Sequence, residues 1–165
     1  MITVRPTLES DVDTLCELQK AAFMPIYKKY HDAGNPYLRG TEDISRRLDS
    51  STFKYFTVLN DGEIVGGVLY RCYGRTPYIA ELSTGEYYLT RIYIKPDHQC
   101  RGIGKQAILL CEKEFGDAVK FYVDFPRELE KNRRCYESAD FYSIGKELEA
   151  EPGLVLAAYE KTVIL

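Results

Sequence analysis

The sequence contains no tryptophan and only two histidines, His31 and His98, among its 165 residues. With so few histidines, no Ser–His–Asp or Cys–His pairing for nucleophilic catalysis can be recognised. The five cysteines are odd in number, and none of them forms a C-x-x-C pair. This pattern argues against a disulfide framework and against a zinc site, and it predicts free thiols in a reducing cytoplasm.

Long apolar runs and an excess of positive charge are also missing. No stretch approaches the length of a membrane span or of a secretory signal, so we expect a cytoplasmic protein that binds no membrane. The net charge of −3 argues against nucleic acid as a partner. The length is sufficient for a hydrophobic core of ordinary size, and we expect residues 1–165 to form a single domain.

The most informative stretch runs from Glu86 to Phe115. Its first part, Tyr87–Ile94, is rich in Tyr, Thr and Ile, which favours a strand. Pro96 ends this strand, because proline has no N–H to donate to a sheet. A polar loop follows, and Gly102 and Gly104 then open a helix whose apolar residues recur at helical spacing.

A glycine-bearing loop that leads into a helix is suited to bind an anion. The N–H groups of the first helical turn have no intrahelical partner, and the helix dipole places partial positive charge there. Glycine lets a phosphate approach the backbone closely, and Arg101 and Lys105 add positive charge. We therefore expect a phosphate or pyrophosphate ligand. The simpler alternative is a strand–turn–helix in which the glycines serve only the turn.

A dinucleotide-binding loop is one specific interpretation. Residues 102–107 fit the pattern G-x-G-x-x-A, and Asp124 lies at a suitable distance to hold a ribose. That pattern requires the strand to run almost directly into the first glycine, whereas residues 95–101 intervene here. The remaining chain is also too short for a full dinucleotide-binding unit.

The other interpretation is a family resemblance. The segment Gln99–Gly104 (QCRGIG) resembles the Q/R-x-x-G-x-G/A motif of the GNAT superfamily of N-acetyltransferases. The resemblance implies that this loop wraps the pyrophosphate of acetyl-coenzyme A, and that the preceding strand pairs with the pantetheine arm. The expected cofactor-binding residues are Ile92, Tyr93, Ile94, Gln99, Cys100, Arg101, Gly102, Ile103, Gly104, Lys105 and Asn132.

A second segment, Asn132–Phe141, resembles the N-x-x-x-Y-E-x-x-G-F pattern of the same family. In that pattern the tyrosine approaches the sulfur of the cofactor, which here implies Tyr136. Its reference pKa of about 10 keeps a tyrosine protonated at neutral pH, so we expect Tyr136 to be the general acid. Asp140 stands where the family usually has glycine. Because both residues tolerate a left-handed backbone, we expect the helix C-cap to be retained.

The general base is less clearly indicated. The family often uses a carboxylate from the central strand, but the middle of this strand has none. Glu86, at its start, shares a face with Tyr88 and Thr90 by the strand period of two, and is the predicted base. No metal is expected to take part. The missing carboxylate leaves an alternative open, in which the chain is a non-catalytic sensor or partner module that binds an acyl-coenzyme A.

The order of predicted elements (β, α, α, β, β, β, α, β, α, β, β) also resembles the GNAT fold. We therefore expect an α+β GNAT acyl-CoA N-acyltransferase fold, with a mixed and mostly antiparallel sheet of about seven strands and about four helices. The sheet is expected to splay between Tyr87–Ile94 and Ala118–Phe125 so that the cofactor can insert. We expect Pro25 to end or kink the first helix, and the mid-strand pair Gly66–Gly67 to mark a place that needs space.

The resemblance implies transfer of the acetyl group of acetyl-coenzyme A to a primary amine of a small molecule or peptide, by direct attack of the amine. A homodimer is compatible with it.

Overall fold

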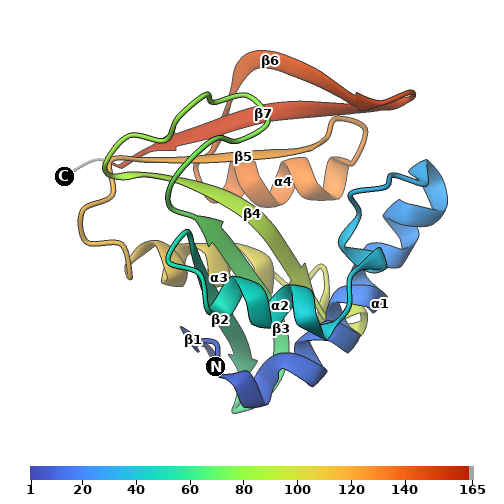
Figure 1. Cartoon of the computed structure of the whole chain (residues 1–165), viewed down its shortest axis with the longest axis vertical. Coiled ribbons are helices and arrows are strands. Elements are labelled where there is room, and N and C mark those ends of the chain that lie inside the picture. The colour runs from blue at the N-terminus through green and yellow to red at the C-terminus, as the bar shows by residue number, and fades with distance from the viewer. Residues whose placement is uncertain (164–165) are drawn as a thin grey trace.

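The computed structural model describes residues 1–163, and its seven strands form one sheet in the order β1-β2-β3-β4-β5-β7-β6 (Figure 1). The strands are β1 (Ile2–Pro6), β2 (Phe53–Asn60), β3 (Glu63–Arg71), β4 (Glu86–Ile94), β5 (Lys120–Pro126), β6 (Tyr142–Glu151) and β7 (Leu154–Thr162). The α-helices are α1 (Val12–Tyr30), α2 (Thr41–Leu48), α3 (Ile103–Glu112) and α4 (Glu130–Ser138). Neighbouring strands are antiparallel except β4 and β5, which are parallel. The predicted order of elements and the mixed sheet are confirmed.

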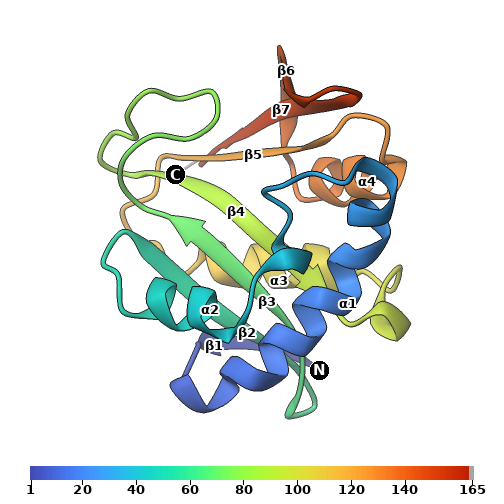
Figure 2. The ribbon, with the colours of Figure 1, turned by 45° about the vertical axis from the view of Figure 1, so that its right-hand side comes forward.

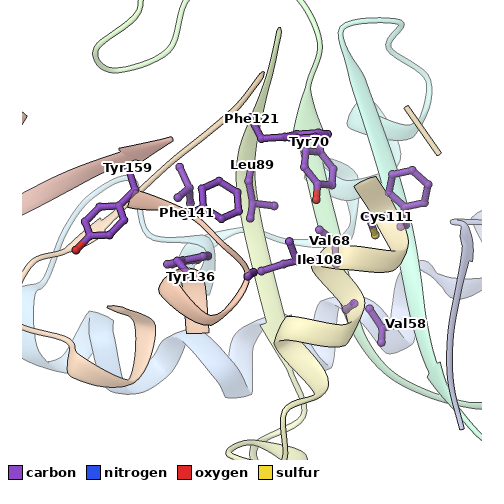
Figure 3. Close-up of a cluster of buried hydrophobic side chains, with 14 of the residues drawn as sticks. Val58, Val68, Tyr70, Leu89, Ile108, Cys111, Phe121, Tyr136, Phe141 and Tyr159 are labelled. Carbon is purple, nitrogen blue, oxygen red and sulfur yellow. The ribbon is translucent and has the colours of Figure 1, made fainter. Parts of the chain in front are cut away.

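The helices cover the two faces of the sheet in pairs, with α1 and α2 on one face and α3 and α4 on the other (Figures 1 and 2). The larger core lies under α3 and α4, and Figure 3 shows its centre, where Tyr70 and Leu89 of the sheet lie near Ile108 of α3. A smaller core under α1 and α2 contains Leu69 and Tyr93. Residues 69 and 70 are adjacent in β3 and lie in different cores, as strand alternation requires.

At one point in the pairing of β3 with β4, the strand β4 has an extra residue. Leu69 pairs with Arg91 and Tyr70 pairs with Leu89, so Thr90 is the extra residue of a β-bulge. The pairing of β4 with β5 stops at Tyr88, just before this bulge. The two strands then separate, which confirms the predicted splay (Figure 1).

The bulge also shifts the alternation of side chains along β4. Strict period two predicts that Leu89, Arg91 and Tyr93 share a face. In the structure Leu89 lies in the larger core, whereas Tyr93 lies in the smaller one and Arg91 contacts α1 and α2. The prediction of one shared face is therefore wrong, because the extra residue at Thr90 reverses the alternation.

The sequence predicts that Pro25 ends or kinks the first helix, and the structure shows that it does not end it. The helix α1 continues through Pro25 to Tyr30, and His31 then adopts a left-handed backbone with φ 51°. Residues 27–30, which follow Pro25, are therefore helical as well.

The C-terminus of α4 is closed as the second motif predicts. Asp140 has φ 72°, in the left-handed region. The N–H of Phe141 donates to the carbonyl of Tyr136 at 3.0 Å, and the N–H of Asp140 donates to the carbonyl of Glu137 at 3.0 Å. These two bonds make a Schellman motif, so aspartate serves at the position where the family pattern has glycine.

The glycine pair in β3 makes room for a buried tyrosine. A Cβ atom on Gly67 would lie 2.5 Å from the hydroxyl oxygen and 2.6 Å from Cζ of Tyr93. The Tyr93 hydroxyl in turn lies 2.6 Å from the hydroxyl of Tyr55, on β2. Gly67 therefore allows three strands to be joined by a tyrosine pair inside the smaller core.

We expect Gly67→Ala to lower the free energy of unfolding by about 1–3 kcal/mol, because the new methyl group must displace the Tyr93 ring. Urea unfolding measures the change. Gly116→Ala is the matched control, since a Cβ there meets no atom within 4 Å. Equal stability of the two variants would show that Tyr93 does not need the space.

Candidate active site

A cleft of about 480 Å³ opens where β4 and β5 separate. Side chains of both strands line it, together with α4, the end of α1 with the loop that follows, and the β6–β7 turn. Of the predicted site residues, Ile92, Asn132 and Tyr136 line this cleft. Another hollow of about 430 Å³, near Arg133 and Lys146, contains none of them.

The glycine loop presents a run of backbone N–H groups. Within residues 1–163, no acceptor is found for the N–H groups of residues 100–105. The first bond of this kind is donated by Gln106 to the carbonyl of Gly102, at 3.1 Å. Cys100 and Gly102 both have left-handed backbones, with φ 62° and 77°. Six consecutive N–H groups at a helix N-terminus are thus available to an anion.

The loop is fixed to its surroundings from two sides. The side chain of Gln99 donates to the carbonyl of Ile94 at 2.9 Å and accepts from Lys131 of α4. A Cβ on Gly104 would lie 3.2 Å from Sγ of Cys135, so α3 begins in close contact with α4. Gln99 therefore braces the loop, and the Ile94 carbonyl expected to face the pantetheine arm already accepts one hydrogen bond.

Tyr136 lies on α4 about one helical turn after Asn132, and its ring is buried in the larger core (Figure 3). The ring packs between Phe125, at a centroid distance of 5.1 Å, and Phe141, at 6.0 Å. Burial raises the pKa of Tyr136, so the phenol is protonated at neutral pH. No hydrogen bond from its hydroxyl to another residue of the described chain is found, and the side chain lines the cleft.

A carboxylate not predicted for this role lies in the same cleft. Asp124 is on β5, half-buried, and accepts a hydrogen bond from the Tyr88 hydroxyl at 2.6 Å. Burial raises the pKa of Asp124 to about 6, although the bond from Tyr88 lowers it. Asp124 and Tyr136 both line the cleft. Burial is the main cause of the raised pKa of Tyr136, and Cys135 and the charge of Asp124 add to it.

Residues 13–141 match the acetyltransferase (GNAT) family. The chain belongs to the GNAT family of acetyltransferases.

Solved structures show the same fold at low sequence identity. PaiA N-acetyltransferase from Thermoplasma acidophilum, in complex with coenzyme A, superposes with a TM-score of 0.76 at 16% identity over 99% of both chains. The aminoglycoside acetyltransferase AAC(6')-Ib, also with coenzyme A, gives 0.74 at 17% identity over 98% of this chain and 95% of that one. The ribosomal-protein-S18-alanine N-acetyltransferase from Escherichia coli gives 0.74 at 12% identity over 100% and 96%. A comparison with curated protein sequences found no match.

Within this GNAT fold, the geometry does not favour Glu86 as the base. Glu86 lies at the start of β4, beside Lys120, where β4 and β5 are still paired. One carboxylate oxygen accepts from the N–H of Ser83 at 2.8 Å and the other from the Tyr122 hydroxyl at 3.0 Å. It is not among the residues that line the cleft.

The sequence offered one signal for Asp124 as the carboxylate of this GNAT cleft. It is the one acidic residue of β5, and alternation places it on the same face as Tyr122. The sequence pattern predicts Asp124 only as a ribose ligand, because its place in the cleft depends on where β4 and β5 separate.

The outer wall of the cleft is closed by contacts between distant segments. Lys29 and Tyr30, at the end of α1, both donate to Glu128 at 3.1 Å, and the N–H of Ala33 donates to Glu151 at 2.8 Å. Figure 2 shows the end of α1 beside α4. The loop after α1 thus joins the β6–β7 turn across the mouth of the cleft.

In residues 1–163, no group of three or more His, Cys, Asp or Glu side chains is gathered closely enough to hold a metal ion. Across the same residues, no helix is long and apolar enough to cross a membrane. All five cysteines are free thiols, as predicted: Cys16, Cys72, Cys100, Cys111 and Cys135.

Proposed function

We propose that this GNAT acetyltransferase moves the acetyl group of acetyl-coenzyme A to a primary amine of a small molecule or peptide, by direct attack of the amine. The observation that carries the proposal is the set of unpaired N–H groups of residues 100–105, in a loop that is held to α4. Asn132 and Tyr136 of the same helix line the cleft together with Asp124. Relatives of this fold act on acceptors as different as an aminoglycoside and a ribosomal protein. The five free thiols support the cytoplasm as the compartment.

The residues of the glycine loop fit a diphosphate. Their N–H groups supply donors, and the exposed side chains of Arg101 and Lys105 supply positive charge. Beyond Tyr88 the edge of β4 is not paired with β5, so backbone groups near Ile92 can pair with the amide groups of an extended arm. Asn132 lines the same cleft from α4. Acetyl-coenzyme A, when bound, supplies an acetyl group activated as a thioester.

Two side chains of the cleft can handle the protons of the reaction. Asp124, with a pKa of about 6, is mostly ionised at pH 7 and can accept the proton that an ammonium must lose before it attacks. Tyr136 stays protonated and can donate to the departing sulfur. The amine nitrogen gains the bond to the acetyl carbon as the carbon–sulfur bond breaks.

The alternative of a non-catalytic acyl-coenzyme A sensor arose because β4 has no carboxylate in its middle. Asp124 supplies a carboxylate from β5 in the same cleft. The observation that motivated the alternative therefore no longer favours it.

Isothermal titration tests the cofactor. We expect acetyl-coenzyme A to bind with a Kd on the order of tens of micromolar or below, since the loop presents preorganised donors. NADH is the control ligand, because a dinucleotide-binding loop would prefer it. Absence of acetyl-coenzyme A binding, or tighter binding of NADH, would overturn the proposal.

Tyr136→Phe should lower kcat by about 10²-fold or more, because removal of the hydroxyl removes the proton donor and keeps the ring. The Kd for acetyl-coenzyme A should stay unchanged, since the ring still packs on Phe125. Release of the coenzyme A thiol measures the rate of turnover, and isothermal titration measures the Kd. Tyr142→Phe is the control, because Tyr142 is exposed on β6. If both variants keep full turnover, Tyr136 is not the acid.

Asp124→Asn should remove the acidic limb of the pH profile. In the wild-type enzyme kcat/KM should fall about tenfold per pH unit below pH 6, because the base works only when ionised and Asp124 takes up a proton there. Asparagine can still accept the bond from Tyr88, so the cleft should keep its shape. Asp117→Asn is the control, since it alters another Tyr–Asp pair, with Tyr87. An unchanged limb in Asp124→Asn would assign the base elsewhere.

A further inference from the structure

Two arginines of the cleft share a single carboxylate. Arg47 on α2 and Arg91 on β4 both line the cleft and both bind Asp43, at 3.3 Å and 2.9 Å. The side chains of Arg91 and Asp43 are only 6% and 7% exposed, and that of Arg47 is 19% exposed. One negative charge thus faces two largely buried positive charges, and the pair of guanidiniums is left with an excess of positive charge.

The protonation behaviour of the cluster agrees with this excess. The pKa of Arg47 is lowered, first by burial and then by the charge of Arg91. Burial alone would raise the pKa of Asp43, but its bonds to Arg91 and Arg47 lower it on balance. Asp43 is therefore ionised, and it does not neutralise both of its partners.

The guanidiniums also have donors to spare. Arg47 binds Asp43 through Nε alone, and its two terminal nitrogens donate to no residue of the described chain. Arg91 uses Nη1 for Asp43 and for Gln19. It also lies beside the Tyr55 hydroxyl, whose pKa is raised by burial and lowered by this guanidinium. The Arg47 side chain is the more exposed of the two, at 19%, so its terminal nitrogens are the ones that a ligand can reach first. Planar donor pairs of this kind match a carboxylate.

The opposite side of the cleft is negative. Asp124 lies on β5, and Asp32 and Glu151 lie where the loop after α1 meets the β6–β7 turn. The cleft therefore has positive charge on the side of α2 and negative charge on the side of β5. A molecule with an amine and a carboxylate close together complements both sides at once.

We propose that the acceptor amine belongs to an amino acid or a similar aminocarboxylate, whose carboxylate binds Arg47 and Arg91 while its amine lies toward Asp124. This inference rests on the proposed acetyl transfer. The amine nitrogen forms the bond to the acetyl carbon, and the carbon–sulfur bond breaks. The ammonium first gives one proton to Asp124 and attacks as the neutral amine. Tyr136 gives its proton to the departing sulfur, and the second proton that the nitrogen loses as the amide forms restores the Tyr136 phenol. A plain amine or polyamine would leave the two guanidiniums with Asp43 as their single carboxylate.

Matched acceptors test the proposal on the full chain. Tyrosine and tyramine, and lysine and cadaverine, differ only in the carboxylate, and amino acid amides keep the shape without the charge. We expect kcat/KM at least about tenfold higher for the carboxylated member of each pair, because a charge-assisted bidentate contact is lost in the other.

Arginine variants locate the contact. Arg47→Gln should bring the kcat/KM values of the two members of each acceptor pair close together, because KM for the amino acid rises. KM for acetyl-coenzyme A should stay unchanged. Arg46→Gln is the matched control, because Arg46 binds the same Asp43 but is 73% exposed and does not line the cleft. Circular dichroism of both variants shows whether they fold.

The possible failures are distinguishable. Equal use of both members of each pair, or equal effects of the two arginine variants, would overturn the carboxylate site while acetyl transfer stands. If no amine is acetylated, calorimetry with tyrosine and tyramine still decides: binding of tyrosine alone, lost in Arg47→Gln, supports the site without the activity. Absence of tyrosine binding at millimolar concentration together with absence of turnover would overturn both proposals.

Discussion

The extra residue at Thr90 ends the pairing of β4 with β5 after three residue pairs, and the cleft exists because of it. A regular strand would keep the parallel ladder and fill the space with backbone hydrogen bonds. The bulge instead leaves the edge of β4 without a neighbouring strand and turns Arg91 and Tyr93 toward α1 and α2. The same extra residue therefore opens a place for an extended ligand and sets which side chains face it.

The helices, the strands and the two motifs could be predicted from local sequence patterns. A glycine loop, a capped helix and an alternating strand each depend on residues that are close together in the sequence. The order of strands, the splay and the left-handed Asp140 agree with those patterns. Strict alternation failed at Thr90, since a bulge depends on how two strands match in length. The position of Glu86 outside the cleft could not be predicted for a related reason. Whether a carboxylate reaches the cleft depends on where β4 and β5 separate, and that point is a property of the two strands together.

The cluster around Asp43 links the stability of the fold to the cleft. It joins α1, α2 and β4 through Gln19, Arg47 and Arg91, where these elements would otherwise meet over a small apolar core. Burying such charges is costly unless every donor and acceptor is used. The terminal nitrogens of Arg47 have no acceptor within the described chain, and both arginines line the cleft.

The two walls of the cleft differ in how firmly they are held. The inner wall is built from strands and α4, whose side chains belong to the larger core. The outer wall depends on the contacts of Lys29 and Tyr30 with Glu128 and of Ala33 with Glu151, all of them solvent-exposed. Exposed polar contacts of this kind break and re-form easily, and salt weakens the ion pair. The entrance can therefore open by local fluctuation while Asp124 and Tyr136 keep their positions on the inner wall. The outer wall can thus admit a ligand without moving the two side chains that we propose as base and acid.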